Sequence, residues 1–304
     1  MPKSIIDRLH EESGQAVVLV LLSLSVVLTI VLFVLSRSVT DVASSTEQAD
    51  AVRAFSAAEA GIETALITGV GTTGNITIGD ASYSVDVKSD ATQTFNYPIP
   101  LLAGDTITIW FMSHTNDGEL TCDSEYPACY TGDTLNLCWG GEGTSAGDAN
   151  TPAIELSLYY ESTPGTLSSV KVARAVYDPH ASRTSNNLFE SASVVPCQID
   201  GIAYAFQKAI TLSSLGGVDF NNNGLIMAKV RMIYNSSQAH YVGVSVASSG
   251  QNLPSQGLEI VSTGYSSVDG TNETQSNRRV SVFKGWPEFP LSGLAVYTPY
   301  GISK

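Results

Sequence analysis

Uncharged and mainly apolar residues run without interruption from position 15 to position 36, and a mixed helical pattern follows them. Ala16 to Leu35 is a run of about 20 residues, long enough at about 1.5 Å per residue to cross a hydrocarbon core of about 30 Å. A secretory signal needs only about 7–15 apolar residues before a small-residue cleavage site, and Ser36-Arg37-Ser38 is a poor one. The pattern therefore predicts a membrane helix that is retained.

Helical periodicity continues beyond the apolar run. The chain has no Pro or Gly between Leu35 and Gly61. Apolar residues recur there at spacings of three, four and seven, and these spacings place them on one helical face: Val39, Val42, Ala49, Val52, Phe55, Ile62 and Leu66. One uninterrupted helix over residues 15–66 would be about 78 Å long. The alternative is a membrane helix followed by a separate amphipathic stalk, since Ser44 and Ser45 are weak helix formers.

The pattern changes to a period of two from about Gly69. In the stretch NITIGDASYSVDV, Tyr83, Val85 and Val87 fall on one face of an expected strand. Further strands are predicted in DTITIWFMS, LNLCW, AIELSLYYE, VKVARAVYD, AYAFQKAITL, LIMAKVRMIY, YVGVSVA, LEIVSTGYS and RRVSVFK, with Gly-, Asn- and Pro-rich breaks between them. The fold class we predict is α+β, a long N-terminal helix followed by a β-rich, antiparallel, sandwich-like body.

The body has two expected arrangements. In the first, residues 69–93 and 248–304 form a sheet region against the helix, and residues 94–247 are an inserted β-sandwich-like domain of ordinary size. Pro-containing stretches, FNYPIP and QNLPSQG, flank this insert. In the second, all strands belong to one continuous assembly. The first is favoured.

Composition and charge limit the classes of partner that the chain can bind. The formal net charge is −14, and Lys and Arg number 15 against 29 Asp and Glu. So acidic a chain repels phosphate backbones, which argues against a nucleic-acid partner. The leader before the apolar run has little positive bias, with Lys3 and Arg8 against three acidic residues. Orientation is inferred instead from the long cysteine-containing body, which places the N-terminus in the cytoplasm and the body outside it.

Four cysteines agree with export, because disulfides persist in oxidising compartments. Cys122 and Cys129 bracket a short loop, and Cys138 and Cys197 lie beside expected strands, so these two pairings are preferred among the three that four cysteines allow. Spacings of six and eight residues do not suit a zinc site, which favours closely spaced pairs.

Two motifs match a catalytic or metal-binding pattern only in part. The stretch GTSAG, from Gly143 to Gly147, matches the nucleophile-elbow pattern, but no helical pattern follows Ser145 and the four His residues are scattered, so we expect no enzyme. The stretch DFNNNG begins like a calcium loop, with Asp219, Asn221 and Asn223 as ligands and Val230 in place of the final Glu. An Asn-rich turn explains that stretch equally well. No other cofactor is expected.

Aromatic residues offer candidate binding faces on the body. Tyr126, Tyr130 and Trp139 form one group and Tyr159 and Tyr160 another. Consecutive strand residues point to opposite faces, so at least one of the second pair should be core.

The N-terminal region resembles the type IV pilin-like proteins, and among them the minor pilins with a PilX-type N-terminus. The resemblance covers about the first 70 residues and is carried by Ser13-Gly14-Gln15, the apolar run, and AVRAFSAAEAGIE at 51–63. It implies cleavage between Gly14 and Gln15 by a prepilin peptidase, leaving residues 1–14 as a leader and 15–68 as the assembly helix. It also implies other pilin-like subunits as partners.

Two positions depart from the family pattern. Most pilins carry Glu as the fifth mature residue, whereas counting from Gln15 places Leu19 there. The leader is acidic where prepilin leaders are usually basic. The first departure implies a minor, non-bulk subunit of a pilus or secretion-like filament, at or near its tip. The alternative function is a membrane-tethered module whose β-body binds a surface ligand or carbohydrate.

Overall fold

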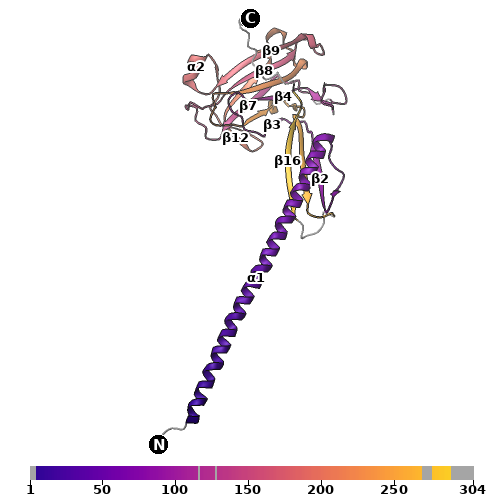
Figure 1. Ribbon diagram of the computed structural model, residues 1–304. Coiled ribbons are helices and arrows are strands. Elements are labelled where there is room, and N and C mark those ends of the chain that lie inside the picture. The colour runs from indigo at the N-terminus through magenta and orange to yellow at the C-terminus, as the bar shows by residue number, and fades with distance from the viewer. Residues whose placement is uncertain (1–4, 116, 127–128, 269–275, 289–304) are drawn as a thin grey trace, which may run out of the picture. The chain divides into compact units, whose positions relative to one another are not determined.

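The computed structural model describes residues 5–115, 117–126, 129–268 and 276–288, with side chains described from Ala16 onward and that of Val218 left out. Figure 1 shows the long helix α1 (Ile5–Thr68) followed by a body built of strands. The α+β fold class is confirmed. The helix runs through Ser44 and Ser45 without a break, so the arrangement with a separate stalk helix is wrong. At about 1.5 Å per residue, α1 is about 96 Å long.

The chain divides into two compact units. The first comprises residues 1–67, 71–86 and 261–281, and the second comprises residues 68–70, 87–260 and 282–304. The second unit is thus larger than the expected insert of residues 94–247. Its extra residues have a physical reason, since Leu253 is fully buried in its core and Gln256 is hydrogen-bonded to the backbone of Trp110.

A four-stranded sheet has the order β1 (Ile76–Ile78), β2 (Ala81–Lys88), β15 (Gly257–Tyr265) and β16 (Asn277–Gly285). β1 and β2 are antiparallel, and Ile78 faces Ala81 across a two-residue turn. Gly79 has φ +59 in that turn, which a Gly tolerates and which suits the twist of a tight hairpin. The first unit contains β1 together with the parts of the other three strands that fall in its ranges.

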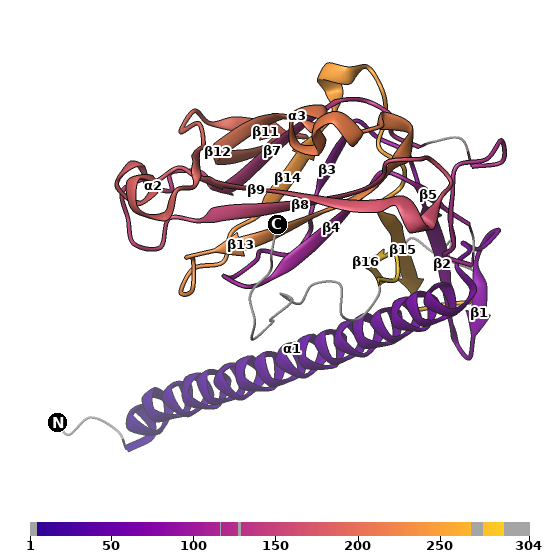
Figure 2. The same cartoon turned by 90° about the horizontal axis from the view of Figure 1, so that it is seen from above.

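Two five-stranded sheets form the sandwich of the second unit. The first has the order β10 (Glu190–Ser191), β9 (Val170–Asp178), β8 (Ala153–Glu161), β13 (Leu225–Ile233) and β4 (Thr106–Trp110). The second has the order β11 (Cys197–Ile199), β12 (Ile202–Thr211), β7 (Thr134–Gly141), β14 (Val242–Ser245) and β3 (Thr94–Asn96). Figure 2 shows β8, β9 and β13 side by side, with β7, β12 and β14 in another layer.

Short elements join these strands. β5 (Ser113–His114) and β6 (Leu120–Thr121) form a small antiparallel hairpin. The short helices are α2 (Ala181–Asn187), α3 (Leu212–Gly216), η1 (Leu167–Ser169), η2 (Gly217–Asp219), η3 (Asn222–Gly224) and η4 (Ala247–Ser249).

Alternation of side chains explains where the core of the sandwich lies. In β4, Ile107 and Ile109 are buried in the core, whereas Thr108 and Trp110 belong to the opposite face. The pairing of β8 with β13 and β9 is antiparallel throughout, and within the two described sheets of the sandwich only the two-residue β10 pairs in parallel, with β9. The nine strand stretches predicted from DTITIWFMS to RRVSVFK are confirmed by β4, β7, β8, β9, β12, β13, β14, β15 and β16.

Candidate functional site

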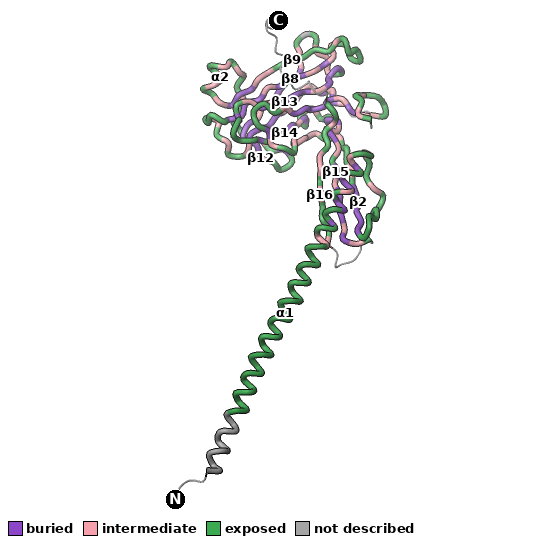
Figure 3. The backbone as a smooth tube through the Cα atoms, in the orientation of Figure 1, coloured by how far each residue is buried: buried purple, intermediate pink, exposed green. Residues whose placement is uncertain are grey.

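The N-terminal part of α1 exposes a continuous apolar surface. Figure 3 shows this helix as exposed from Ala16 until its last turns. No part of its most apolar stretch is buried, and by length and composition the segment beginning at Ala16 is a candidate membrane span. Leu19, the residue in the family's Glu position, is 60% exposed. An apolar surface of this size is stable only in lipid or against other protein.

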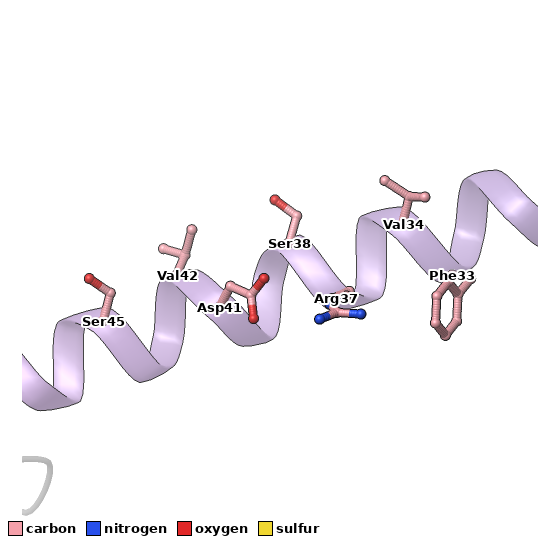
Figure 4. A pocket seen from close by; sticks show the side chains of 7 residues that line it. All are labelled: Phe33, Val34, Arg37, Ser38, Asp41, Val42 and Ser45. Carbon is pink, nitrogen blue, oxygen red and sulfur yellow. The ribbon is translucent and has the colours of Figure 1, made fainter.

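Polar and charged residues begin abruptly where the apolar run ends. Figure 4 shows Phe33, Arg37 and Asp41 on one side of α1, with Val34, Ser38, Val42 and Ser45 on the other. Residues four apart lie on the same helix face, so Phe33, Arg37 and Asp41 follow one another along one face. This face changes from apolar to charged at Arg37. This stretch is the boundary between the candidate span and the polar half of the helix.

The last turns of α1 pack on the small sheet through small residues. The buried residues are Ala54, Ala57, Ala58, Gly61, Ile62 and Ala65. A Cβ built on Gly264 would lie 2.0 Å from the Ala54 carbonyl oxygen and 2.4 Å from the Ala58 nitrogen. Helix backbone therefore contacts strand backbone directly at this point, and a side chain on Gly264 has no room.

This buried face differs from the face that the larger apolar residues form. Val39, Val42, Val52 and Phe55 are 70%, 65%, 66% and 45% exposed, whereas Ile62 is buried. Close backbone approach selects small residues instead, because large side chains would hold helix and sheet apart. The large residues are therefore left exposed among the described residues.

Polar contacts fix the rotation of the helix on the sheet. Arg53 donates from Nη1 to the Ser266 carbonyl oxygen at 3.5 Å and to Asp50 Oδ1 at 3.2 Å. Farther along, the Thr64 and Tyr83 hydroxyl oxygens are 3.4 Å apart. Arg53 and Thr64 are eleven residues apart, about three helical turns, so both contacts lie along the same side of α1.

The processing residues lie at the edge of what is described. Gly14 and Gln15 fall within the backbone of α1, but their side chains lie outside the described residues. Cleavage between them stays a prediction.

Both preferred disulfides are confirmed. Cys122 is bonded to Cys129, closing the short loop, and Cys138 on β7 is bonded to Cys197 on β11. Cys138 is fully buried with Ile199 and Tyr204 in a small cluster of its own. The second bond ties together strands on either side of β12, across a sequence separation of 59 residues.

The residues of the calcium hypothesis already have protein partners. Asp219 Oδ2 accepts from Lys171 Nζ at 2.5 Å, and this hydrogen bond raises the pKa of Lys171. Asn221 Oδ1 accepts from the Asn223 backbone nitrogen at 3.0 Å and caps η3. Among the described residues no group of three or more His, Cys, Asp or Glu is placed to hold a metal. The calcium site stays a prediction.

The calcium hypothesis makes a sharp thermal prediction. Binding to the folded state should raise the melting temperature as CaCl2 is added, and Asp219→Ala should abolish the rise. Asp148→Ala, in another loop of the same unit, is the matched control and should keep it. An equal response to CaCl2 in all three proteins, measured by differential scanning calorimetry, would remove this loop as the site.

The nucleophile-elbow motif has no catalytic geometry in the described residues. Ser145 Oγ accepts from the Gly147 backbone nitrogen at 3.2 Å and is not hydrogen-bonded to any described His. The nearby His240 accepts from the Gly141 nitrogen through Nδ1, while its Nε2 is buried without a partner. The serine therefore lacks the base that its activation requires.

His114 lies between two tryptophans in the second unit. Its ring stacks on Trp286 with centroids 4.8 Å apart, and contacts Trp110 edge to face at 4.5 Å. Only 7% of the residue is exposed, and burial lowers the pKa of His114 to about 4. The neutral imidazole is thus part of the packing of this cluster.

The depressed pKa of His114 predicts acid sensitivity. The unfolded chain takes up a proton near pH 6.5 while the folded chain resists until about pH 4, so stability is complete above 6.5 and falls between these values. The loss from this group is at most about 1.4 kcal/mol per pH unit. Urea melts of wild type and His114→Gln from pH 7 to 4.5 should diverge, with the variant flatter. If stability fell equally with pH in the two proteins, His114 would not be the source of the acid sensitivity. The pKa of His240 is also lowered by burial, but this residue is present in both proteins and does not affect the comparison.

The aromatic groups expected to mark binding faces are mostly core. Tyr130, Trp139 and Tyr160 are 1%, 0% and 3% exposed, so they cannot receive a ligand. Sequence analysis missed the aromatics that do line a pocket, among them Tyr97, Trp110 and Trp286. They are brought together by distant segments of the chain, so their local patterns could not reveal them.

Comparison with protein-family models, with curated proteins and with solved structures finds no match to this chain.

Proposed function

We propose that this chain is a minor pilin-like structural and assembly subunit of a type IV pilus or type II-secretion-like filament. Before assembly the subunit is held in the membrane by α1, with the N-terminus in the cytoplasm and the β-body outside. After assembly it belongs to the filament at the cell surface, at or near the tip. Its partners are other pilin-like subunits and a prepilin peptidase.

One observation carries this proposal. The helix is a single element of 64 residues, and its exposed apolar residues extend past the length that a membrane requires. Val39, Val42 and Val52 lie beyond the apolar run, in the half of α1 that a simple anchor would make polar. Helix packing between subunits would bury them. Leu19 supports a minor rather than a bulk role, because it cannot supply the buried carboxylate of the family.

The competing function is a membrane-tethered β-sandwich that binds a ligand, as a cell-surface adhesin would. It uses α1 only as an anchor, so it is indifferent to whether the leader is removed. The aromatic-lined pocket of the second unit favours it. The two functions are compatible if a tip subunit also adheres.

Mass spectrometry of the N-terminus tests the filament proposal. The chain is expressed with and without a prepilin peptidase, and a new N-terminus at Gln15 is expected only when the peptidase is present. Gly14→Leu is the matched variant and should remain unprocessed, since the small residue at the cleavage site is lost. A wild-type chain that still begins at Met1 when the peptidase is present, or one that is cut beyond Ser36, would overturn the proposal.

A further inference from the structure

A pocket of about 130 Å³ lies within the second unit, at one open side of the sandwich. It is lined by residues of β3 and β4, which are edge strands of the two different sheets. The other wall comes from Gln256 and from the chain at 283–288. Edge strands leave such a position uncovered unless another segment packs across it.

The aromatic wall of the pocket is fixed in place. Trp286 donates from its indole nitrogen to the Ser255 carbonyl oxygen at 2.9 Å, and one face of its ring stacks on His114. Gln256 accepts from the Trp110 nitrogen at 2.7 Å and donates to the Trp110 oxygen at 3.0 Å. Both tryptophans are therefore held before any ligand arrives, which lowers the entropic cost of binding.

A buried hydroxyl in this wall has no partner. Thr108 is 8% exposed, and its Oγ1 makes no hydrogen bond in the described residues. A hydroxyl that is buried without a hydrogen-bond partner destabilises the protein, so a ligand that pairs with it removes this cost. Tyr97 adds a second hydroxyl to the lining.

Charge at the pocket selects against anions. Glu288 lines it and is paired with Lys229, whose Nζ lies 2.5 Å from Glu288 Oε2. Lys229 is already neutralised by this pair, and the residue is only 5% exposed. Burial raises the pKa of Tyr97, and the negative charges of Glu288 and Asp105 raise it further. A phosphate or carboxylate would be repelled there.

We propose that this pocket binds one neutral pyranose ring. A sugar ring offers C–H groups to aromatic side chains and hydroxyls to Thr108, Tyr97 and Glu288, so it matches both kinds of wall. The volume is below the roughly 300 Å³ of a drug-sized site, which fits one ring inserted in part. A purely apolar ligand would leave the Thr108 hydroxyl unpaired.

Saturation-transfer NMR tests the site on the full chain in a zwitterionic detergent without sugar headgroups. The probes are the methyl glycosides of glucose, galactose, mannose and N-acetylglucosamine, with methyl glucuronide as the anionic comparator. Transfer to at least one neutral glycoside is expected, and little to the glucuronide. Thr108→Val should weaken binding about tenfold, because shape is kept and one hydrogen bond is lost. Trp286→Leu should abolish it.

Thr77→Val, on the exposed strand β1, is the matched control and should bind as wild type does. All proteins are first shown to melt at similar temperatures, so that loss of binding is not loss of fold. The inference is overturned if no neutral glycoside receives saturation, if the glucuronide binds best, or if Thr108→Val binds as tightly as wild type. Each result is independent of filament assembly and of leader cleavage.

Discussion

Gly264→Val separates the last turns of α1 from the small sheet, and we expect it to destabilise the first unit by about 3 kcal/mol, the upper end of the usual cost of overpacking. The side chain would enter space occupied by the Ala54 carbonyl and the Ala58 nitrogen. Backbone atoms cannot rotate away as a flexible side chain can, so the helix must move. Hydrogen exchange at the amides of β2, followed by mass spectrometry, should become faster, while exchange in the sandwich strands should not change.

Gly147→Val is the matched control for this change. A Cβ at Gly147 would meet nothing closer than the Ser145 hydroxyl at 3.8 Å, and the residue is exposed. We expect a change of less than about 0.5 kcal/mol there. If the exchange rates of β2 were equal in the two variants, the close contact between helix and sheet would be contradicted.

Asp178→Ala should destabilise the sandwich by about 3–5 kcal/mol. Asp178 is fully buried and accepts from Arg183 twice, from Nε at 3.0 Å and from Nη2 at 2.8 Å. It also accepts from the His180 nitrogen and from Asn187 Nδ2. Its loss would leave the Arg183 guanidinium, whose side chain is 19% exposed, without its carboxylate. Urea unfolding of the sandwich, followed by tryptophan fluorescence, measures the change.

Asp219→Ala removes the carboxylate of an exposed ion pair and serves as the comparison. The side chains of Lys171 and Asp219 are 44% and 56% exposed, and solvent screens such a pair so that it contributes little to stability. The two variants should therefore differ several-fold in their effect. If the two variants lost similar amounts of stability, burial would not be the reason why the Asp178 hydrogen bonds stabilise the sandwich.

Elements with a strong local pattern could be predicted from the sequence. The absence of Pro and Gly between Leu35 and Gly61 indicated that the helix continues, and alternation located the strands of the sandwich. The preferred cysteine pairs followed from a short loop and from two positions beside strands. The helix and the strands can be inferred from neighbouring residues alone, and the cysteine pairs require only one contact between distant positions.

Features set by contact between distant segments could not be predicted. The packing face of α1 includes Ala54, Ala58 and Gly61, and only the strand opposite, with Gly264, makes small residues the right choice. The spacing of the larger residues put Val52 and Phe55 on one helical face but could not show that this face is exposed. The pocket likewise joins Trp110 to Trp286 across most of the body, a pairing without a sequence signal.

The large residues left exposed on α1 are central to the proposed function, since assembly is what would cover them. Site-specific photocrosslinking in the native cell tests this most directly, with a benzoylphenylalanine placed at Val42 or Val52. Leu167, which is 81% exposed on the β-body, is the control position. We predict adducts at both helix positions, identified by mass spectrometry as other pilin-like subunits, and none of these at Leu167. Helix positions that yield no adduct with such a subunit, while the protein is present in the membrane, would contradict the account.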